Sequence, residues 1–160
     1  MSDLTQFLQL FNPYPGSHYM EVTTSSDDTT QSLSNLLDGI GEFTLVLYSD
    51  TLVNELKNTN IKYVKTLKEP FRAVPRSNDI VILKDIFSIH ENQDMILKLS
   101  YSSLANTADI IIMEKKGILD IEAIKIKLED FEFRAVNDID IVDGYDLIMA
   151  KKMHMWGNGL

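Results

Sequence analysis

Short runs of consecutive apolar residues recur along this chain and alternate with segments of helical spacing. Seven such runs are typical of buried strands. They cover residues 19–22, 43–48, 61–64, 79–83, 109–113, 133–136 and 145–150. Runs such as 79–83 are continuously apolar rather than alternating, so we expect parallel strands that are covered on both faces.

Between these runs, apolar residues recur every three or four positions, which predicts amphipathic helices. The stripes are Leu33, Leu36, Leu37 and Ile40; Leu52, Val53 and Leu56; Met95, Ile96, Leu99 and Leu104; and Ile118, Ile121, Ile124 and Leu128. Gly39 and Gly41 are expected to end the first of these helices. A short additional helix is expected over residues 4–11, before the turn-forming residues 12–16.

The alternation of strands and helices predicts an α/β fold with right-handed crossovers. The last two strands are separated only by residues 137–144, which is too short for a crossover helix. A hairpin fits this spacing, so we expect the final strand to run antiparallel to its neighbours.

The length of 160 residues and the hydrophobic content of 44% suit one domain with a sizeable core. We expect a single domain over residues 1–160, with an N-terminal extension at 1–18 and a C-terminal tail at 153–160. The segment before Pro13, expected to be exposed, and the tail residues 153–156 are candidate contacts for a homodimer.

Several kinds of site and location are disfavoured by what the sequence lacks. There is no cysteine, so disulfides and thiolate chemistry are excluded, and the three histidines are too far apart to suggest a metal site. No run of 18 apolar residues predicts a membrane span, and the first residues do not resemble a secretory signal. We therefore expect a cytoplasmic protein that does not bind membranes.

The formal net charge of -9 argues against binding to nucleic acid. The charge is unevenly placed, because residues 1–56 contain eight acidic residues and no Lys or Arg. Residues 57–76 contain six Lys or Arg against Glu69 alone. This basic stretch is either a solvated helix face and loop or a patch for an anionic substrate or an acidic partner surface.

The order of the elements, with its closing hairpin, resembles the class I S-adenosylmethionine-dependent methyltransferase fold over about residues 19–152. Residues 78–87 look like the fourth strand of that family and the polar residues that follow it. Residues 131–136 and 145–152 look like its last two strands, including the basic end. The resemblance implies a Rossmann-like, mostly parallel sheet of about seven strands, with an antiparallel C-terminal hairpin strand and helices on both faces.

The resemblance also implies S-adenosylmethionine as the cofactor, bound at the carboxyl ends of the strands. The cofactor-binding candidates are Glu21, Thr23, Ser25, Asp50, Lys84 and Asp85. In the family, an acid at the end of the second strand, here Asp50, accepts hydrogen bonds from both ribose hydroxyls. An acid in the first strand, here Glu21, holds the cofactor loop or approaches the methionine amine. The alternatives are a helix N-cap for Asp50 and an ordinary strand residue for Glu21.

The turn after the first strand departs from the family pattern. Residues 23–28 read TTSSDD, and no glycine lies between Gly16 and Gly39. Glycines in such a turn allow positive φ and a close approach of backbone amides to a ligand. The turn is therefore either a polar N-cap loop without a ligand or a modified cofactor loop.

Polar residues also follow the predicted fourth strand, where ligands bind in open α/β sheets. A polar group there could orient a nucleophile or accept its proton, so Asp85 and His90 are candidate catalytic residues. The alternatives are a helix cap and surface ion pair for Lys84 and Asp85, and a solvated loop position for His90.

Two functions follow from these observations. One is a methyltransferase-like protein that binds S-adenosylmethionine and a small-molecule substrate. The other is a non-catalytic pseudoenzyme, a binding or scaffolding module that acts through a protein partner. The glycine-free turn favours the second, whereas Glu21 and Asp50 favour the first. A receiver-like domain is a weaker alternative, because Lys115 and Lys116 suit it but the terminal hairpin does not.

Overall fold

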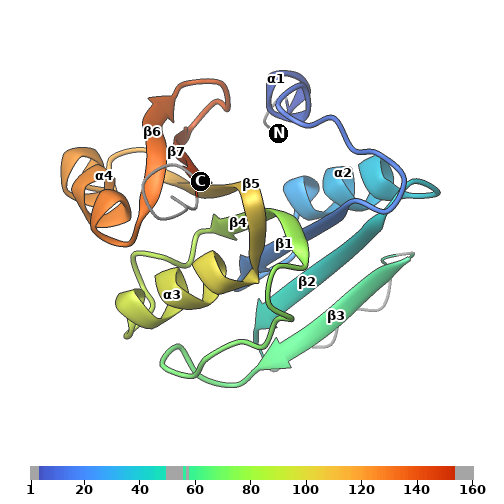
Figure 1. Cartoon of the computed structure of the whole chain (residues 1–160), viewed down its shortest axis with the longest axis horizontal. Helices are drawn as coiled ribbons and strands as arrows, with labels where there is room; N and C mark the ends of the chain where they lie inside the picture. The colour runs from blue at the N-terminus through green and yellow to red at the C-terminus, as the bar shows by residue number, and fades with distance from the viewer. Residues whose placement is uncertain (1–3, 50–55, 57, 154–160) are drawn as a thin grey trace.

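The computed structural model describes residues 4–49, 56 and 58–153, and its centre is one seven-stranded sheet (Figure 1). The strands are β1 (His18–Thr23), β2 (Glu42–Tyr48), β3 (Thr59–Val64), β4 (Asn78–Lys84), β5 (Leu104–Lys115), β6 (Phe133–Ile139) and β7 (Tyr145–Lys152). Their order across the sheet is β3-β2-β1-β4-β5-β7-β6. Each of the seven predicted apolar runs lies within one of these strands.

The direction of the strands places a natural binding position in the middle of the sheet. Strands β1 to β5 pair in parallel, and β7 runs antiparallel to β5 and β6, which confirms the predicted final hairpin. From β1 the chain winds outward through β2 and β3, and it then returns to β4 on the other side of β1. Ligands of open α/β sheets bind where the winding reverses in this way, here beyond the carboxyl ends of β1 and β4.

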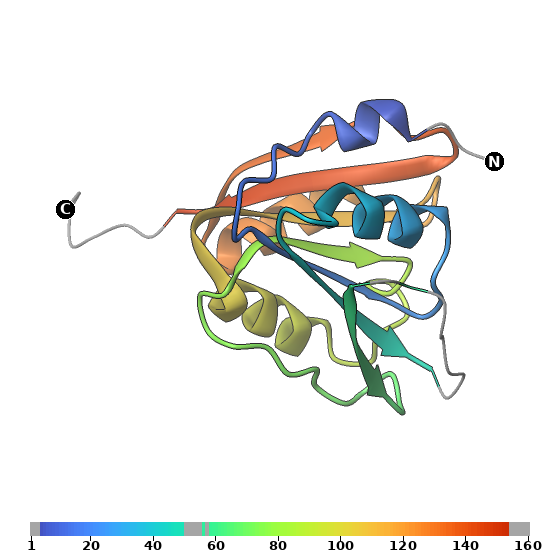
Figure 2. The same cartoon turned by 90° about the vertical axis from the view of Figure 1, so that its right-hand side faces the viewer.

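Helices cover both faces of the sheet. The helices α1 (Thr5–Leu8) and α2 (Asp28–Leu37) lie on one face, and α3 (Gln93–Ser103) and α4 (Ile121–Asp130) lie on the other (Figure 2). Adjacent residues of β4 point to opposite faces, because Val81 packs with Ile96 of α3 while Ile82 packs with Leu33 of α2. Burying each such side chain contributes roughly 1.5–3 kcal/mol. The continuously apolar strands therefore have the two-sided burial that their pattern predicted.

The ends of the helices are fixed by individual side chains. Asp27 caps α2 and Asp120 caps α4, each through a carboxylate that accepts a backbone N–H. At the far end of α3, the Lys152 ammonium donates to the carbonyls of Tyr101 and Leu104, both at 2.8 Å. Gly41 follows α2 at a close backbone approach, where an added Cβ would lie 2.3 Å from the Ser17 carbonyl oxygen.

The N-terminal segment belongs to the core, which corrects the expectation that it is exposed. Phe7 has no exposed surface and Phe11 is 8% exposed. Their rings meet edge to face with centroids 5.0 Å apart, and Phe11 meets Tyr19 of β1 in the same way at 5.5 Å. These side chains therefore pack on this chain's own sheet, and the homodimer contact stays a prediction.

One crossover of the sheet lacks a helix. Residues 65–77, which connect β3 to β4, contain no helix and form a loop with turns at residues 67–68 and 75–76. The predicted helical stripe that begins at Leu52 and Val53 lies mostly outside the described residues. Among the helices of the described chain, none is long and apolar enough to span a membrane.

Candidate functional site

A group of charged and polar side chains gathers at the reversal point of the sheet. It consists of Asp27, Lys84, Asp85 and Tyr145, which we call the strand-end cluster. Lys84 ends β4, Asp85 follows it, Asp27 precedes α2, and Tyr145 begins β7. Elements far apart in the sequence therefore meet beside the N-terminus of α2.

Asp27 has two tasks in this cluster. Its Oδ1 accepts hydrogen bonds from the backbone N–H groups of Thr29 (3.0 Å) and Thr30 (3.4 Å), and the Thr30 hydroxyl accepts the Asp27 N–H at 3.2 Å. This is a capping box, and it confirms the prediction that the turn ends in an N-cap. The other carboxylate oxygen, Oδ2, binds the Lys84 ammonium.

Lys84 is the centre of the cluster and is only 2% exposed. Besides Asp27, its Nζ donates to Asp85 Oδ2 at 2.9 Å and to the Tyr145 hydroxyl at 3.3 Å, so all three of its donors have partners. Burial lowers the Lys84 pKa, but hydrogen bonds and the charges of Asp27 and Asp85 outweigh this effect and raise it overall. Lys84 therefore remains a cation throughout the physiological range.

Asp85 and Tyr145 close the cluster on the β4 side. Asp85 adopts a left-handed backbone with φ of 52°, which Asp tolerates better than most residues, and its N–H donates to the Met113 carbonyl at 2.9 Å. The Tyr145 hydroxyl donates to Asp85 Oδ2 at 3.1 Å. The predicted alternative of an ion pair between Lys84 and Asp85 is confirmed, but Lys84 is buried rather than at the surface, and Asn92 rather than either residue caps α3.

Glu21 lies near this cluster in the interior. It has no exposed surface, and neither carboxylate oxygen has a hydrogen-bond partner among the described residues. Burial raises the pKa of Glu21 to about 8, the Lys84 charge opposes the rise, and the Asp27 and Asp85 charges add to it. Glu21 is therefore mostly protonated at neutral pH, which removes the cost of burying an unpaired anion.

The turn between β1 and α2 is formed without a glycine-like backbone. Residues 23–28 are all described, and none of them has positive φ. Thr23 is buried and its hydroxyl donates to the Ser25 carbonyl at 3.3 Å, whereas the Ser25 side chain is exposed. A cavity of about 230 Å³ opens over the N-terminus of α2, between the cluster, Leu4 and Val142.

The other predicted candidates lie elsewhere. Asp50 is outside the described residues. His90 is 4% exposed rather than solvated: its Nδ1 accepts the Asn92 N–H at 2.8 Å, its Nε2 faces the Glu69 carbonyl at 3.4 Å, and burial lowers its pKa. Its polar contacts thus join two loops and do not reach the strand-end cluster. Among the described residues, no group of three acidic or histidine side chains could hold a metal ion.

Three residues of functional interest were not predicted from the sequence. Tyr145 and the ion-pairing role of Asp27 depend on contacts across about 60 positions, for which the sequence offers no local signal. Glu114 is 2% exposed at the end of β5 and accepts from the Ser88 N–H and hydroxyl at 2.7 and 2.6 Å. An acid that directly follows an apolar strand was a signal that could have identified Glu114.

Comparison with known proteins gives matches by structure only. No protein-family model and no curated protein matches the sequence. An S-adenosylmethionine-dependent methyltransferase from Aquifex aeolicus matches with a TM-score of 0.78 and 17% identity, covering 94% of this chain and 90% of that chain. A chain from a complex with the Trm112 methyltransferase activator of Haloferax volcanii has a TM-score of 0.73 and 12% identity, covering 96% and 89%.

A third match extends the same fold to a larger protein. Haemonchus contortus phosphoethanolamine N-methyltransferase 2, in complex with phosphomonomethylethanolamine and S-adenosylhomocysteine, has a TM-score of 0.72 and 10% identity. The match covers 94% of this chain but only 52% of that chain. The strand order, the antiparallel β7 and these structural matches together show that this chain has the class I S-adenosylmethionine-dependent methyltransferase fold.

Proposed function

We propose that this chain is a non-catalytic binding module with a methyltransferase fold. The observation that carries the proposal is the position of Lys84. Its ammonium donates to Asp27, Asp85 and Tyr145 at once, at the point of the sheet where a cofactor would meet the β1–α2 turn. Fold alone does not determine activity, so the proposal depends on this site rather than on the structural matches.

The described residues of the turn do not fit S-adenosylmethionine. Side chains stand at every position of residues 23–28, and no backbone there has the positive φ that lets amides approach a ligand closely. The cavity of about 230 Å³ beside α2 is smaller than the roughly 300–1,000 Å³ of most small-molecule sites. The methyl-transfer step therefore has no supported route through these residues.

Opening the cluster for a ligand would also be costly. Separating a buried ion pair so that one charge loses its partner costs roughly 3–5 kcal/mol, and less where water can enter. Asp27 and Asp85 have 37% and 25% of their side chains exposed, so the lower end of that range applies. Every 1.4 kcal/mol spent in this way weakens the ligand affinity about tenfold.

A second candidate function is S-adenosylmethionine binding, and Glu21 is the observation that favours it. A fully buried carboxyl group without a hydrogen-bond partner is rare in folded proteins and often marks a functional site. In this case a ligand would displace Lys84 from Asp27 and reach the region of Glu21.

Calorimetric titration with S-adenosylmethionine and S-adenosylhomocysteine separates the two candidates. We expect no saturable heat at millimolar ligand from the wild-type protein, with its folding checked by circular dichroism. Saturable binding that Asp50→Ala weakens would contradict our proposal and support the second candidate. The same titration of Lys84→Met and of its matched control Lys98→Met tests the role of the cluster. Only the first variant lacks the ammonium group that binds Asp27 in the turn.

A protein partner is part of this proposal. The Haloferax volcanii match comes from a complex with a methyltransferase activator, so a chain of this fold does take part in protein–protein assembly. A module without catalysis would act through such contacts, and a pull-down under native conditions should recover a stoichiometric partner. Recovery of the chain alone would weaken this part of the proposal.

A further inference from the structure

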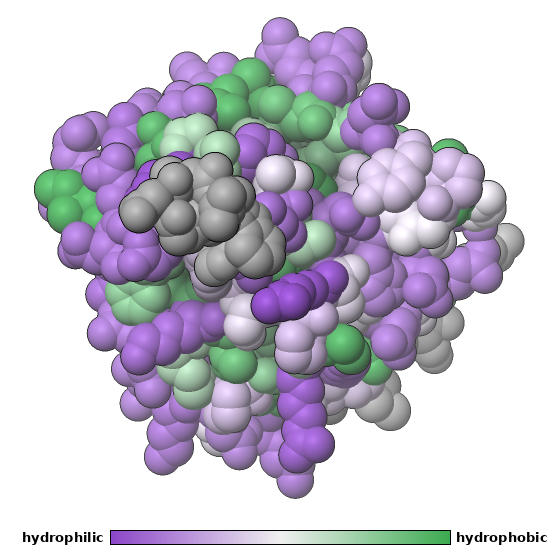
Figure 3. Space-filling view, in the orientation of Figure 1, coloured by the Kyte–Doolittle hydropathy of each residue, from purple (hydrophilic) through white to green (hydrophobic). Residues whose placement is uncertain are grey.

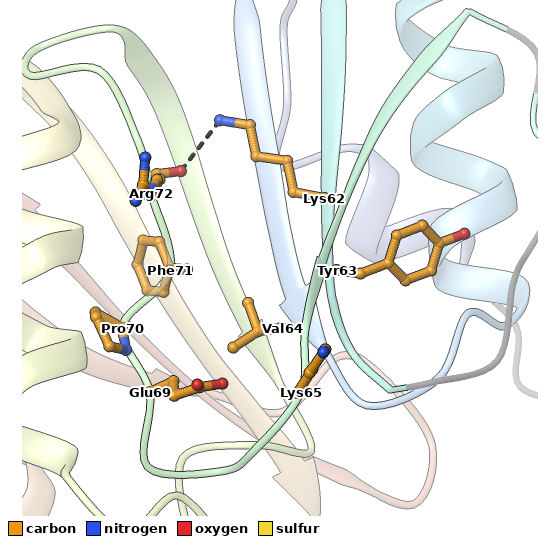
Figure 4. Close-up of a pocket in the computed structure, with 8 residues that line it drawn as sticks. All are labelled: Lys62, Tyr63, Val64, Lys65, Glu69, Pro70, Phe71 and Arg72. Carbon is orange, nitrogen blue, oxygen red and sulfur yellow. Dashed lines mark hydrogen bonds between the residues drawn. The ribbon is translucent and has the colours of Figure 1, made fainter.

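A groove lies between β3 and the loop that returns toward β4 (Figure 4). It has a volume of about 500 Å³. Lys62 of β3 points across it toward Arg72 and Val64 points toward Phe71, whereas Tyr63 points away (Figure 4). The β3–β4 connection contains no helix, so this part of the sheet lacks the cover that α3 and α4 give to the other strands. We call this feature the basic groove.

Hydrogen bonds from several elements hold the walls of the basic groove in place. The Lys62 ammonium donates to the Arg72 carbonyl at 3.1 Å, and the Tyr48 hydroxyl of β2 donates to the Glu69 carbonyl at 2.7 Å. Phe71 is only 2% exposed and anchors the loop in the core. A groove fixed before binding spares its ligand the cost of ordering it.

No carboxylate in the described part of the chain neutralises the cations of the basic groove. Lys65 and Arg72 line it and are exposed, and Lys68 and Arg76 are exposed in the same connection. Among the described residues, no carboxylate forms an ion pair with any of these four side chains or with Lys62. Glu69, the one acid in this stretch, accepts the Thr66 N–H at 3.2 Å instead.

Three of the eight residues that line the basic groove are cations, and Glu69 is the one acid among them. Hydrophilic residues dominate the face shown in Figure 3, and apolar residues form separate small groups there. The net charge of -9 opposes a long polyanion such as nucleic acid, whose affinity depends on many phosphate contacts. A short acidic segment needs only the local cations, and the apolar surfaces of Val64 and Pro70 can receive a side chain between them.

We propose that the basic groove binds an extended acidic segment of a partner protein. Its carboxylates would reach the Lys65 ammonium and the Arg72 guanidinium, and an apolar side chain would lie against Val64 and Pro70. Guanidinium and carboxylate groups match in bidentate geometry, which adds orientation to the attraction. The inference is independent of the proposed function, because no residue of the strand-end cluster lines this groove.

Selection from a random peptide library displayed on phage tests the proposal with the wild-type protein as bait. We expect the enriched peptides to be rich in Asp and Glu. Measured by calorimetry, the best of them should bind Lys65→Glu/Arg72→Glu at least about tenfold more weakly than wild type, and its affinity should fall as salt increases. The control Lys98→Glu/Lys115→Glu makes the same charge change at two exposed lysines elsewhere and should bind within about twofold of wild type.

Four results would overturn the proposal. Enrichment of peptides without acidic residues would do so, as would equal weakening by the groove and control variants. Tighter binding of a single-stranded DNA oligonucleotide than of the acidic peptides would assign the basic groove to nucleic acid instead. Light scattering is the remaining check, because a change of oligomeric state in Lys65→Glu/Arg72→Glu would make a second copy of this chain the occupant.

Discussion

Lys84 and Lys65 both lie at the carboxyl ends of parallel strands, but their surroundings differ completely. Lys84 ends β4, is buried, and has three hydrogen-bond partners. Lys65 follows β3, is exposed, and has no carboxylate partner among the described residues. Lys84 is bound by side chains of the fold itself, whereas Lys65 can bind a ligand. The fold therefore pairs the lysine at the reversal point of the sheet with its own side chains, and leaves the lysine after the edge strand β3 without a described carboxylate partner.

The largest expected effect comes from removing the central cation of the strand-end cluster. Lys84→Met leaves Asp27 and Asp85 close together without a counter-charge, so we expect the free energy of unfolding to fall by about 2–3 kcal/mol. Lys65→Met is the matched control and should change it by less than about 0.5 kcal/mol. Urea denaturation followed by circular dichroism measures both. Equal stability of the two variants would break the comparison between the two lysines.

The next effect concerns the pH dependence that Glu21 imposes. Between the unfolded pKa of 4.5 and the folded pKa of about 8, the native state keeps a proton that the unfolded state has released. Raising the pH through this window therefore destabilises the protein, by up to about 1.4 kcal/mol per pH unit. In Glu21→Gln this contribution is absent. Parallel plots of unfolding free energy against pH for wild type and variant would show that Glu21 is already ionised in the folded protein.

A smaller effect is expected from the hydroxyl that closes the cluster. Tyr145→Phe keeps the ring, whose centroid lies 4.9 Å from the Lys84 Nζ, but removes the hydrogen bonds to Asp85 and Lys84. We expect a loss of about 1 kcal/mol, seen as a drop of roughly 2–4 °C in Tm. Tyr14→Phe is the control, because it removes an exposed hydrogen bond to Asp79 of 2.8 Å and should cost less. A larger drop for Tyr14→Phe would reverse the assigned importance of the two hydroxyls.

The smallest effect on stability is expected in the basic groove. Arg72→Gln leaves the backbone carbonyl that Lys62 binds and removes only an exposed charge, so the free energy of unfolding should stay within about 0.5 kcal/mol of wild type. Thermal unfolding at low and high salt measures this. A marked destabilisation would mean that the Arg72 side chain is part of the fold rather than a free binding group.

The fold was predictable because it depends on local patterns. The apolar runs predicted all seven strands, and the short spacing after residue 136 predicted the antiparallel β7. The predicted ends of two helices were wrong, because packing rather than local pattern determines where a helix ends. The apolar stripes continue to Ile40 and Leu104. In the structure, α2 ends at Leu37 and Leu104 begins β5. The burial of Phe7 and Phe11 was also missed, although both are apolar at helical spacing.

The location of the candidate site could be predicted from the sequence, but the interactions between its side chains could not. Glu21, Lys84 and Asp85 were identified because they lie in or just after predicted strands, and the structure brings them to one region. The sequence did not predict that Asp27 binds Lys84, because that contact joins residues 57 positions apart. Their role toward a cofactor stays a prediction, as does that of Asp50.

A nuclear magnetic resonance titration of uniformly ¹⁵N-labelled protein tests the central claim most directly. S-adenosylhomocysteine is added first, and an acidic peptide selected on the wild-type protein is added second. We predict no saturable shift in residues 23–28 or at Asp85 with the first ligand, and saturable shifts confined to residues 62–72 with the second. Saturable shifts of the turn with S-adenosylhomocysteine would show that the strand-end cluster opens to a cofactor and would contradict the account.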